Sequence, residues 1–140
     1  MNVREFKEVK ELLSSKKNIV LVPHRNPDGD AIGACLAMYH YLQKKGHSVS
    51  VVAPNDYPHF LKWMPGEDSI VKYDAQQDES DTLLQAANII FTLDFNALGR
   101  IGNMATAVAN TKAIKIMIDH HQQPDDYALY TYSDISMSST

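Results

Sequence analysis

The hydrophobic residues near the N-terminus and after position 30 recur at helical spacing. This spacing predicts two amphipathic helices, at residues Val3–Ser15 and Asp30–Gly46, and the glycine that ends the second is typical of a helix C-terminus. Two shorter helices are predicted further along, one beginning at Ser80 or Asp81 as N-cap and one across residues 102–111.

Four short, continuous apolar runs alternate with these helices. They read NIVLVPH, SVSVVAP, NIIFTLD and AIKIMID, at residues 18–24, 48–54, 88–94 and 113–119. Runs of this kind are typical of strands that are buried on both faces. Alternating strands and helices predict one α/β domain, in which helices flank a mostly parallel, twisted sheet in a Rossmann-like three-layer arrangement. Residues 55–69 are expected to be an ordered connector that Trp63 anchors.

Composition narrows the class of protein. The chain has 140 residues, 44% of them hydrophobic, which suffices for the core of one ordinary domain. Its formal charge of -4 argues against a broad basic surface for long nucleic acids, but it leaves room for a local phosphate pocket. No apolar run is long enough to span a membrane and no signal peptide is evident, so a cytoplasmic location is expected. The single Cys35 excludes an intrachain disulfide and a cysteine-rich zinc site.

Polar clusters follow three of the predicted strands. The first runs from His24 to Asp30, the second is Asp94, and the third is the triplet 119–121, Asp-His-His. Because the carboxyl ends of parallel strands share one edge of a sheet, we expect these clusters to converge there. Carboxylates so close together repel one another unless cations neutralise them. Imidazoles mixed with carboxylates suit divalent manganese, magnesium or zinc, and the excess of carboxylates favours the harder ions.

Each residue taken alone has a structural alternative. Asp28 or Asp30 could simply cap the second helix, Asp94 could be another N-cap, and His24 could be a buried structural histidine. The joint occurrence of three acidic clusters at strand ends, two of them with histidines, favours the metal site. Arg100 could bind a substrate phosphate or form a surface ion pair, and both interpretations remain open.

Three segments also resemble the signature motifs of a known family. The stretches HRNPDGDAIG, TLDFNALGRIG and MIDHHQQP are similar to those of the DHH phosphoesterase superfamily, in particular its DHH/DHHA nano-RNase type. Members of that group are cytoplasmic enzymes that degrade very short oligonucleotides, and many dephosphorylate adenosine bisphosphate. The resemblance implies a phosphoesterase that acts through a water activated by two metal ions, with short oligonucleotides or nucleotide bisphosphates as substrates. Two Mn²⁺ ions are expected, with Mg²⁺ or Co²⁺ as substitutes, and a homodimer is compatible with the resemblance.

The resemblance also implies a role for each motif residue. His24 and Asp28 correspond to ligands of one metal, Asp30 and His120 to ligands of the other, and Asp94 to the bridge between them. Asp119 and His121 correspond to the family's catalytic pair. Asp119 would orient the neighbouring imidazole, and His121 would face the substrate phosphate.

The chain departs from the family pattern at its C-terminal end. The family has a further acidic ligand and a C-terminal substrate-binding domain, so residues 1–140 are expected to be an N-terminal DHH domain cut short before both. Such a fragment should bind metal weakly and show little turnover by itself. Two other functions stay open, a DHH-type inorganic pyrophosphatase and a non-catalytic nucleotide-sensing domain. Gly29 between the two aspartates favours the nuclease and phosphatase branch over the pyrophosphatases.

Overall fold

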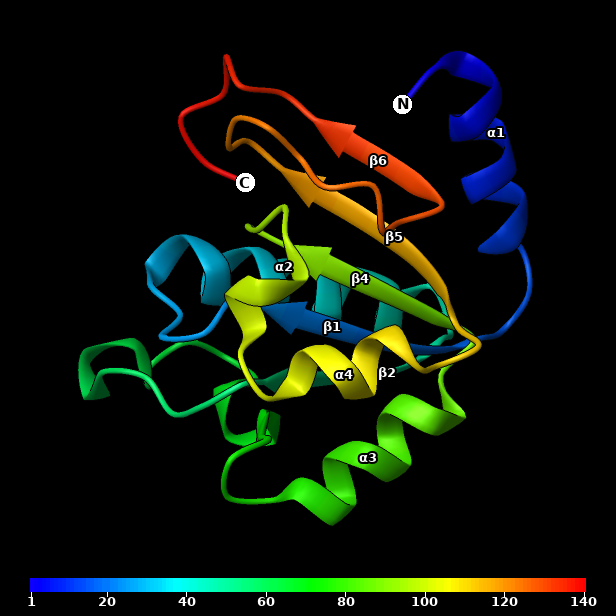
Figure 1. The fold of residues 1–140 in the computed structure, drawn as a ribbon. Helices are drawn as coiled ribbons and strands as arrows, with labels where there is room; N and C mark the ends of the chain where they lie inside the picture. Colours follow the sequence, from blue (N-terminus) through cyan, green and yellow to red (C-terminus); the bar gives the residue numbers. More distant parts are fainter.

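A six-stranded sheet forms the centre of the computed structural model, which describes residues 1–140 (Figure 1). The strands are β1 (Asn18–Pro23), β2 (Ser48–Ala53), β3 (Val71–Lys72), β4 (Ile89–Leu93), β5 (Ile114–Asp119) and β6 (Tyr130–Ser133). They lie in the order β3-β2-β1-β4-β5-β6, and every neighbouring pair is parallel. The predicted α/β fold with a parallel sheet is therefore confirmed.

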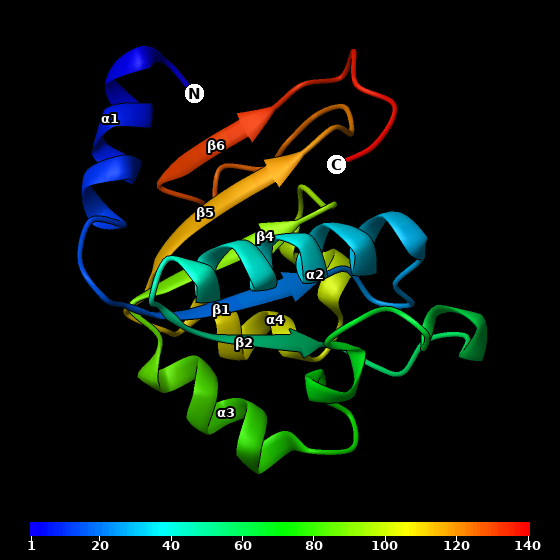
Figure 2. The same ribbon diagram turned by 180° about the vertical axis from the view of Figure 1, so that it is seen from behind.

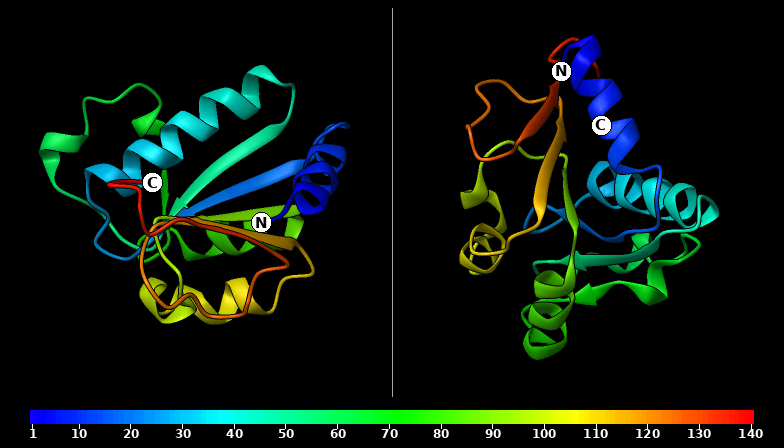
Figure 3. Two further views of the ribbon diagram at one scale, coloured as in Figure 1. Left: turned by 90° about the horizontal axis from the view of Figure 1, so that it is seen from above. Right: turned by 90° about the vertical axis from the view of Figure 1, so that its right-hand side faces the viewer.

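Helices cover both faces of the sheet. They are α1 (Val3–Leu12), α2 (Gly29–Lys44), α3 (Gln77–Ala86) and α4 (Met104–Ala109). Figures 1 and 2 show α3 and α4 on one face and α1 and α2 on the other, and the edge-on view in Figure 3 separates the three layers. No helix is both long and apolar enough to cross a lipid bilayer.

Strand β1 shows why the apolar runs are continuous. Ile19 and Leu21 belong to the core beneath α2, whereas Val20 and Val22 belong to the core beneath α3 and α4. Successive side chains of a strand point to opposite faces, so a strand with helices on both sides needs apolar residues at every position. This central strand leads directly into the first polar cluster.

Both long helices carry the end signals that their sequences suggest. Asn2 and Glu5 form a capping box at the start of α1. At the end of α2, Gly46 adopts a φ of 92°, its amide donates to the Gln43 carbonyl, and the His47 amide donates to that of Leu42. This is a Schellman motif, in which the glycine follows the helix, so the helix ends two residues before the predicted boundary.

The start of α3 and the bounds of α4 differ from the prediction. Helix α3 begins at Gln77, and neither Ser80 nor Asp81 caps it. The buried Ser80 lies inside the helix, where its hydroxyl donates to the Gln76 carbonyl, a bond that serine can make from a helical position. Helix α4 is shorter than residues 102–111, because Gly102 at φ 56° forms a turn before it.

The connector at residues 55–69 is ordered, but its anchor was wrongly predicted. It contains two 3₁₀ helices, His59–Leu61 and Glu67–Ser69. The Trp63 side chain is 77% exposed and anchors nothing, whereas Tyr57 and Leu61 are only 6% exposed and pack in the core.

We predict that Leu21→Ala destabilises the fold strongly. The Leu21 side chain is fully buried on the central strand, and removing such a side chain costs about 2–5 kcal/mol of unfolding free energy. Urea unfolding followed by circular dichroism measures this loss. The matched control is Leu129→Ala, at a leucine that is 64% exposed, which should change stability by less than about 0.5 kcal/mol. Equal effects of the two substitutions would contradict the assigned core.

Candidate metal centre

Three neighbouring strands bring the polar clusters together at one edge of the sheet. His24 directly follows β1, Asp94 directly follows β4, and Asp119 is the last residue of β5. Since β1, β4 and β5 are adjacent in the sheet, residues separated by up to about a hundred positions in the chain become neighbours. The convergence expected from the sequence is therefore present.

Asp94 lies at the centre of the cluster and faces two histidines. Its carboxylate is buried, with Oδ2 3.6 Å from His24 Nε2 and Oδ1 3.3 Å from His120 Nε2. Its backbone has a φ of 67°, the left-handed region that aspartate and asparagine tolerate better than most residues. No helix begins at Asp94, so the N-cap alternative is wrong. One carboxylate oxygen of Asp94 thus faces each imidazole.

Backbone carbonyls orient both of these imidazoles. The Nδ1 atom of His24 lies 2.7 Å from the Arg25 carbonyl oxygen, and that of His120 lies 3.2 Å from the Met137 carbonyl oxygen. A carbonyl only accepts hydrogen bonds, so each Nδ1 carries the proton and donates it. In the neutral rings, Nε2 then presents its lone pair to the carboxylates, as a metal-binding histidine requires.

Asp28, the N-cap of α2, and Asp30, in its first turn, flank this arrangement. Asp28 Oδ1 accepts a hydrogen bond from the Ala31 amide and also lies 3.8 Å from His24 Nε2. The residue therefore caps the helix, as the structural alternative expects, and still lies within the cluster. Asp30 Oδ2 lies 3.6 Å from His120 Nε2.

Asp119 and His121 form a separate pair beside the cluster. The buried Asp119 accepts from the His121 amide at 2.9 Å and lies 2.6 Å from His121 Nδ1. Oδ1 thus orients the imidazole and Oδ2 binds the backbone amide of His121, whose side chain remains 42% exposed. His121 also has a nitrogen within 4.8 Å of ligand atoms of Asp94 and His120, so the geometry permits it to contact a cation as well as a substrate.

The cluster carries negative charge that no basic side chain offsets. Lysine and arginine ion pairs all involve other carboxylates, so Asp28, Asp30, Asp94 and Asp119 have histidines, but no lysine or arginine, within ion-pair distance. The contact with Asp94 raises the pKa of His24, although burial opposes it. Burial alone would raise the pKa of Asp94, but His24 and a hydrogen bond from Thr140 outweigh it and hold that pKa below its usual range. The site thus favours the ionised carboxylate and attracts positive charge.

The donor atoms fit two divalent cations. Two groups of side chains have ligand atoms close enough to hold an ion, and Asp94 belongs to both: His24, Asp28, Asp94 and Asp94, His120, His121. Ligand atoms of an octahedral cation of the magnesium type are about 3 Å apart, slightly less than the nitrogen–oxygen separations here. Imidazole together with several carboxylates suits manganese, magnesium or zinc.

One residue at the site was missed by the sequence analysis. The Thr140 hydroxyl donates to Asp94 Oδ1 at 2.8 Å, and its amide donates to Asp30 Oδ2 at 2.9 Å. It follows β6, which carries half-buried and exposed residues and was not recognised as a strand. Had that short strand been predicted, the same strand-end rule would have pointed to the segment 134–140.

The two arginines near the motifs differ in their contacts. Arg25 pairs with Asp74 at 2.8 Å and packs against Gly102, so its role is structural. Arg100 lies in the 3₁₀ helix Leu98–Ile101, is exposed and forms no ion pair, so the surface ion-pair alternative is wrong. Its carbonyl accepts from the Arg25 amide at 2.7 Å, which holds this turn next to the first motif. Cys35 is fully buried and cannot serve as an exposed nucleophile.

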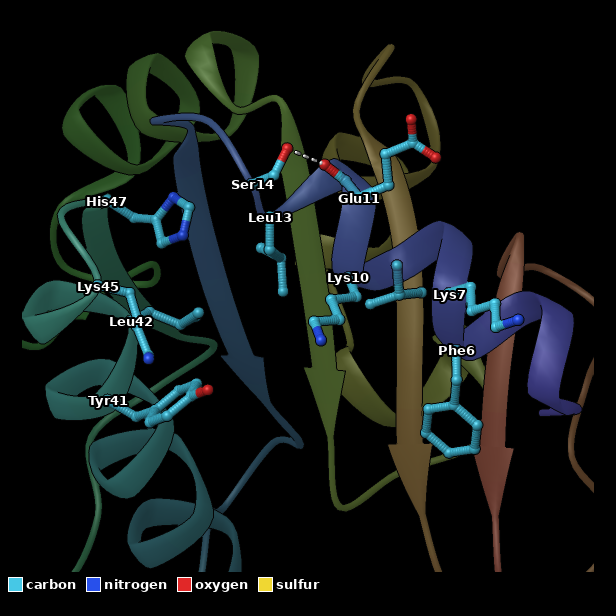
Figure 4. Close-up of a pocket in the computed structure, with 11 residues that line it drawn as sticks. Phe6, Lys7, Lys10, Glu11, Leu13, Ser14, Tyr41, Leu42, Lys45 and His47 are labelled. Carbon is cyan, nitrogen blue, oxygen red and sulfur yellow. Dashed lines mark hydrogen bonds between the residues drawn. The ribbon is translucent and has the colours of Figure 1, made fainter.

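A wide hollow in the surface lies away from the motif residues. It has a volume of about 780 Å³ and lies between α1 and the C-terminal end of α2, with Phe6 and Tyr41 among its lining residues (Figure 4). None of the motif residues lines it, and Glu11 is its only carboxylate. The chemistry of the strand-end cluster therefore identifies the candidate site better than the size of this hollow does.

The motifs, the parallel sheet and the polar side chains at its edge agree with the match to one protein family. The model of the DHH family, N-terminal domain, matches residues 18–140, and the chain belongs to this family of phosphoesterases. It is 31% identical over 103 residues to the bifunctional oligoribonuclease and PAP phosphatase NrnA of Thermus thermophilus, covering 74% of this chain and 28% of that protein.

Solved structures agree with this assignment. An exopolyphosphatase-related protein from Bacteroides fragilis superposes with a TM-score of 0.96 at 43% identity, over 99% of this chain and 41% of that one. The exonuclease RecJ, solved with bound manganese, shares the fold with a TM-score of 0.53 at 16% identity, over 95% of this chain and 32% of that one. The chain thus spans less than half the length of each of these relatives.

We predict that Asp94→Asn abolishes or strongly weakens Mn²⁺ binding. Asparagine keeps the shape and tolerates the left-handed backbone, but it removes the charge and one of the two anionic oxygens. Mn²⁺ affinity should fall at least about 100-fold, because substitution of residues that only support metal ligands already lowers metal affinity by up to about 100-fold. Calorimetric titration measures it, and Asp78→Asn on the exposed surface of α3 is the control. Unchanged Mn²⁺ affinity in a folded Asp94→Asn protein would remove Asp94 from the site.

A second prediction concerns Thr140. Thr140→Val keeps the size of the side chain and removes the hydroxyl that donates to Asp94, so Mn²⁺ affinity should fall about 10-fold. Thr140→Ser restores the hydroxyl and should restore the affinity in the same titration. If valine and serine variants bind equally well, the hydrogen bond does not position Asp94.

Proposed function

We propose that this domain belongs to a metal-dependent phosphoesterase that hydrolyses short oligonucleotides, adenosine 3′,5′-bisphosphate, or both. The observation that carries the proposal is the central Asp94 carboxylate, with one oxygen toward each of two oriented histidines. The likeness to a protein named as both oligoribonuclease and PAP phosphatase supports the substrate class. The relatives named above give no support to a pyrophosphatase. We further propose that residues 1–140 act as the N-terminal DHH domain of such an enzyme, in keeping with their share of those relatives.

The proposal assigns the side chains of the cluster as ligands of two cations. His24 and Asp28 would hold one cation, Asp30 and His120 a second, and Asp94 both. Manganese is the proposed ion, because of the carboxylate-rich donor set and the metal bound by RecJ. When bound, two such ions lower the pKa of a water molecule and offset the charge of a phosphoryl group.

The protein's own groups would orient the substrate. Asp119 Oδ1 lies 2.6 Å from His121 Nδ1, which gives the imidazole one direction, and Asp119 Oδ2 accepts from the His121 amide. From that position His121 Nε2 would donate a hydrogen bond to a phosphate oxygen, where negative charge grows during hydrolysis. Arg100, exposed and without an ion pair, is the proposed second phosphate contact.

Hydrolysis of two substrates tests this function. With Mn²⁺ present, we expect the domain to release mononucleotide from a dinucleotide, or inorganic phosphate from adenosine 3′,5′-bisphosphate. The rate should be low, because the related proteins contain more than twice as many residues. Product chromatography measures it, and His121→Gln should reduce it by about 100-fold or more while leaving the fold intact.

Two outcomes would count against the proposal. Hydrolysis that is unaffected by chelation of divalent ions would remove the metal site from the mechanism. Release of phosphate from pyrophosphate alone, with neither nucleotide cleaved, would favour the pyrophosphatase function instead.

A further inference from the structure

We propose that the cavity between the first motif and the connector binds a nucleobase of the substrate, with Phe60 as its stacking surface. This inference rests on the proposed function and specifies how that site would select nucleotides. The cavity has a volume of about 460 Å³, within the usual range for small-molecule sites.

The cavity adjoins the candidate metal site through a shared side chain. Asp28 lines it and also lies 3.8 Å from His24 Nε2, and its side chain is 66% exposed. A phosphate held at the metal centre would therefore have its attached nucleoside next to this cavity. No lysine or arginine lines the cavity, so it suits an uncharged planar ring better than a second phosphate.

Phe60 is exposed on a turn that is firmly held. Its side chain is 72% exposed, yet Tyr57 and Leu61 on either side of it are buried in the core. The Tyr57 hydroxyl donates to Glu67 Oε1 at 2.6 Å, and Leu61 approaches the start of α2 at Gly29. The exposed ring thus projects from an ordered turn that lines the cavity.

A pair of asparagines ties the connector to the first motif. Asn55 Oδ1 accepts from the Asn26 amide, and Asn55 Nδ2 donates to Asn26 Oδ1, both at 2.8 Å. The two walls of the cavity are therefore held at a fixed separation. Aromatic rings held in this way serve as stacking surfaces for bases, and each stacked base contributes about 1–3 kcal/mol to binding in alanine-substitution experiments.

Calorimetry on the Mn²⁺-loaded protein tests the inference with two ligands. Adenosine 3′,5′-bisphosphate carries a base, and inorganic phosphate does not. Phe60→Ala should weaken binding of the nucleotide about 5- to 150-fold and leave phosphate binding unchanged. Phe60→Tyr keeps an aromatic ring and should bind the nucleotide as tightly as the unmodified protein.

The connector provides a matched control. Trp63 is 77% exposed on the same segment but does not line the cavity, so Trp63→Ala should bind both ligands normally. Unchanged nucleotide affinity in Phe60→Ala, or an equal loss for Trp63→Ala, would overturn the inference. So would equal weakening of nucleotide and phosphate, which would indicate a change in fold.

The same titrations separate this inference from the proposed function. If the unmodified protein binds phosphate and nucleotide equally, the base makes no contact, and the stacking site fails while the phosphoesterase function stands. If the loaded protein binds neither ligand, the proposed function fails, and the stacking site fails with it.

Discussion

Crowded carboxylates at the end of a buried parallel sheet are the constraint around which the site is organised. Asp94 and Asp119 are each only 2% exposed, and neither has a lysine or arginine as partner. Burying an ionised group without a compensating charge or hydrogen bond is costly. The protein limits this cost with hydrogen-bond donors from two segments: His121, which donates to Asp119, and the Thr140 hydroxyl, which donates to Asp94. The negative charge that these donors do not offset attracts cations to the site.

The fold supplies this edge because both faces of the sheet are covered. Strands β1 and β4 carry apolar residues toward both helical layers, so polar groups can gather only where the strands end. Helix α2 starts within the first motif, and the aspartate that caps it, Asp28, lies beside His24. The same side chain therefore caps a helix and also lies within the candidate metal centre, so the capping role does not exclude the proposed role as a ligand.

Much of this could be predicted from the sequence, for identifiable reasons. Continuous apolar runs located four strands. The three polar clusters located the candidate residues, because the carboxyl ends of parallel strands lie along the same edge of a sheet. Strand β3 was missed because two residues carry no pattern, and β6 because its side chains are half-buried or exposed. Thr140 was therefore missed as well. Trp63 was misjudged because size alone does not reveal which aromatic of a loop points inward; Tyr57 does so, and its hydroxyl has a partner in Glu67.

The asparagine pair that joins Asn26 to Asn55 would couple the two proposed binding events, of the cation and of the nucleobase. Asn26 is two residues from Asp28, and Asn55 begins the connector. A shift of the first motif, residues 24–30, would therefore also move the connector, which lines the neighbouring cavity. Any ligand that binds more tightly when the cation is present must, by thermodynamic reciprocity, increase the affinity for the cation by the same factor. Metal occupancy in the cell would then follow the supply of substrate as well as the supply of metal.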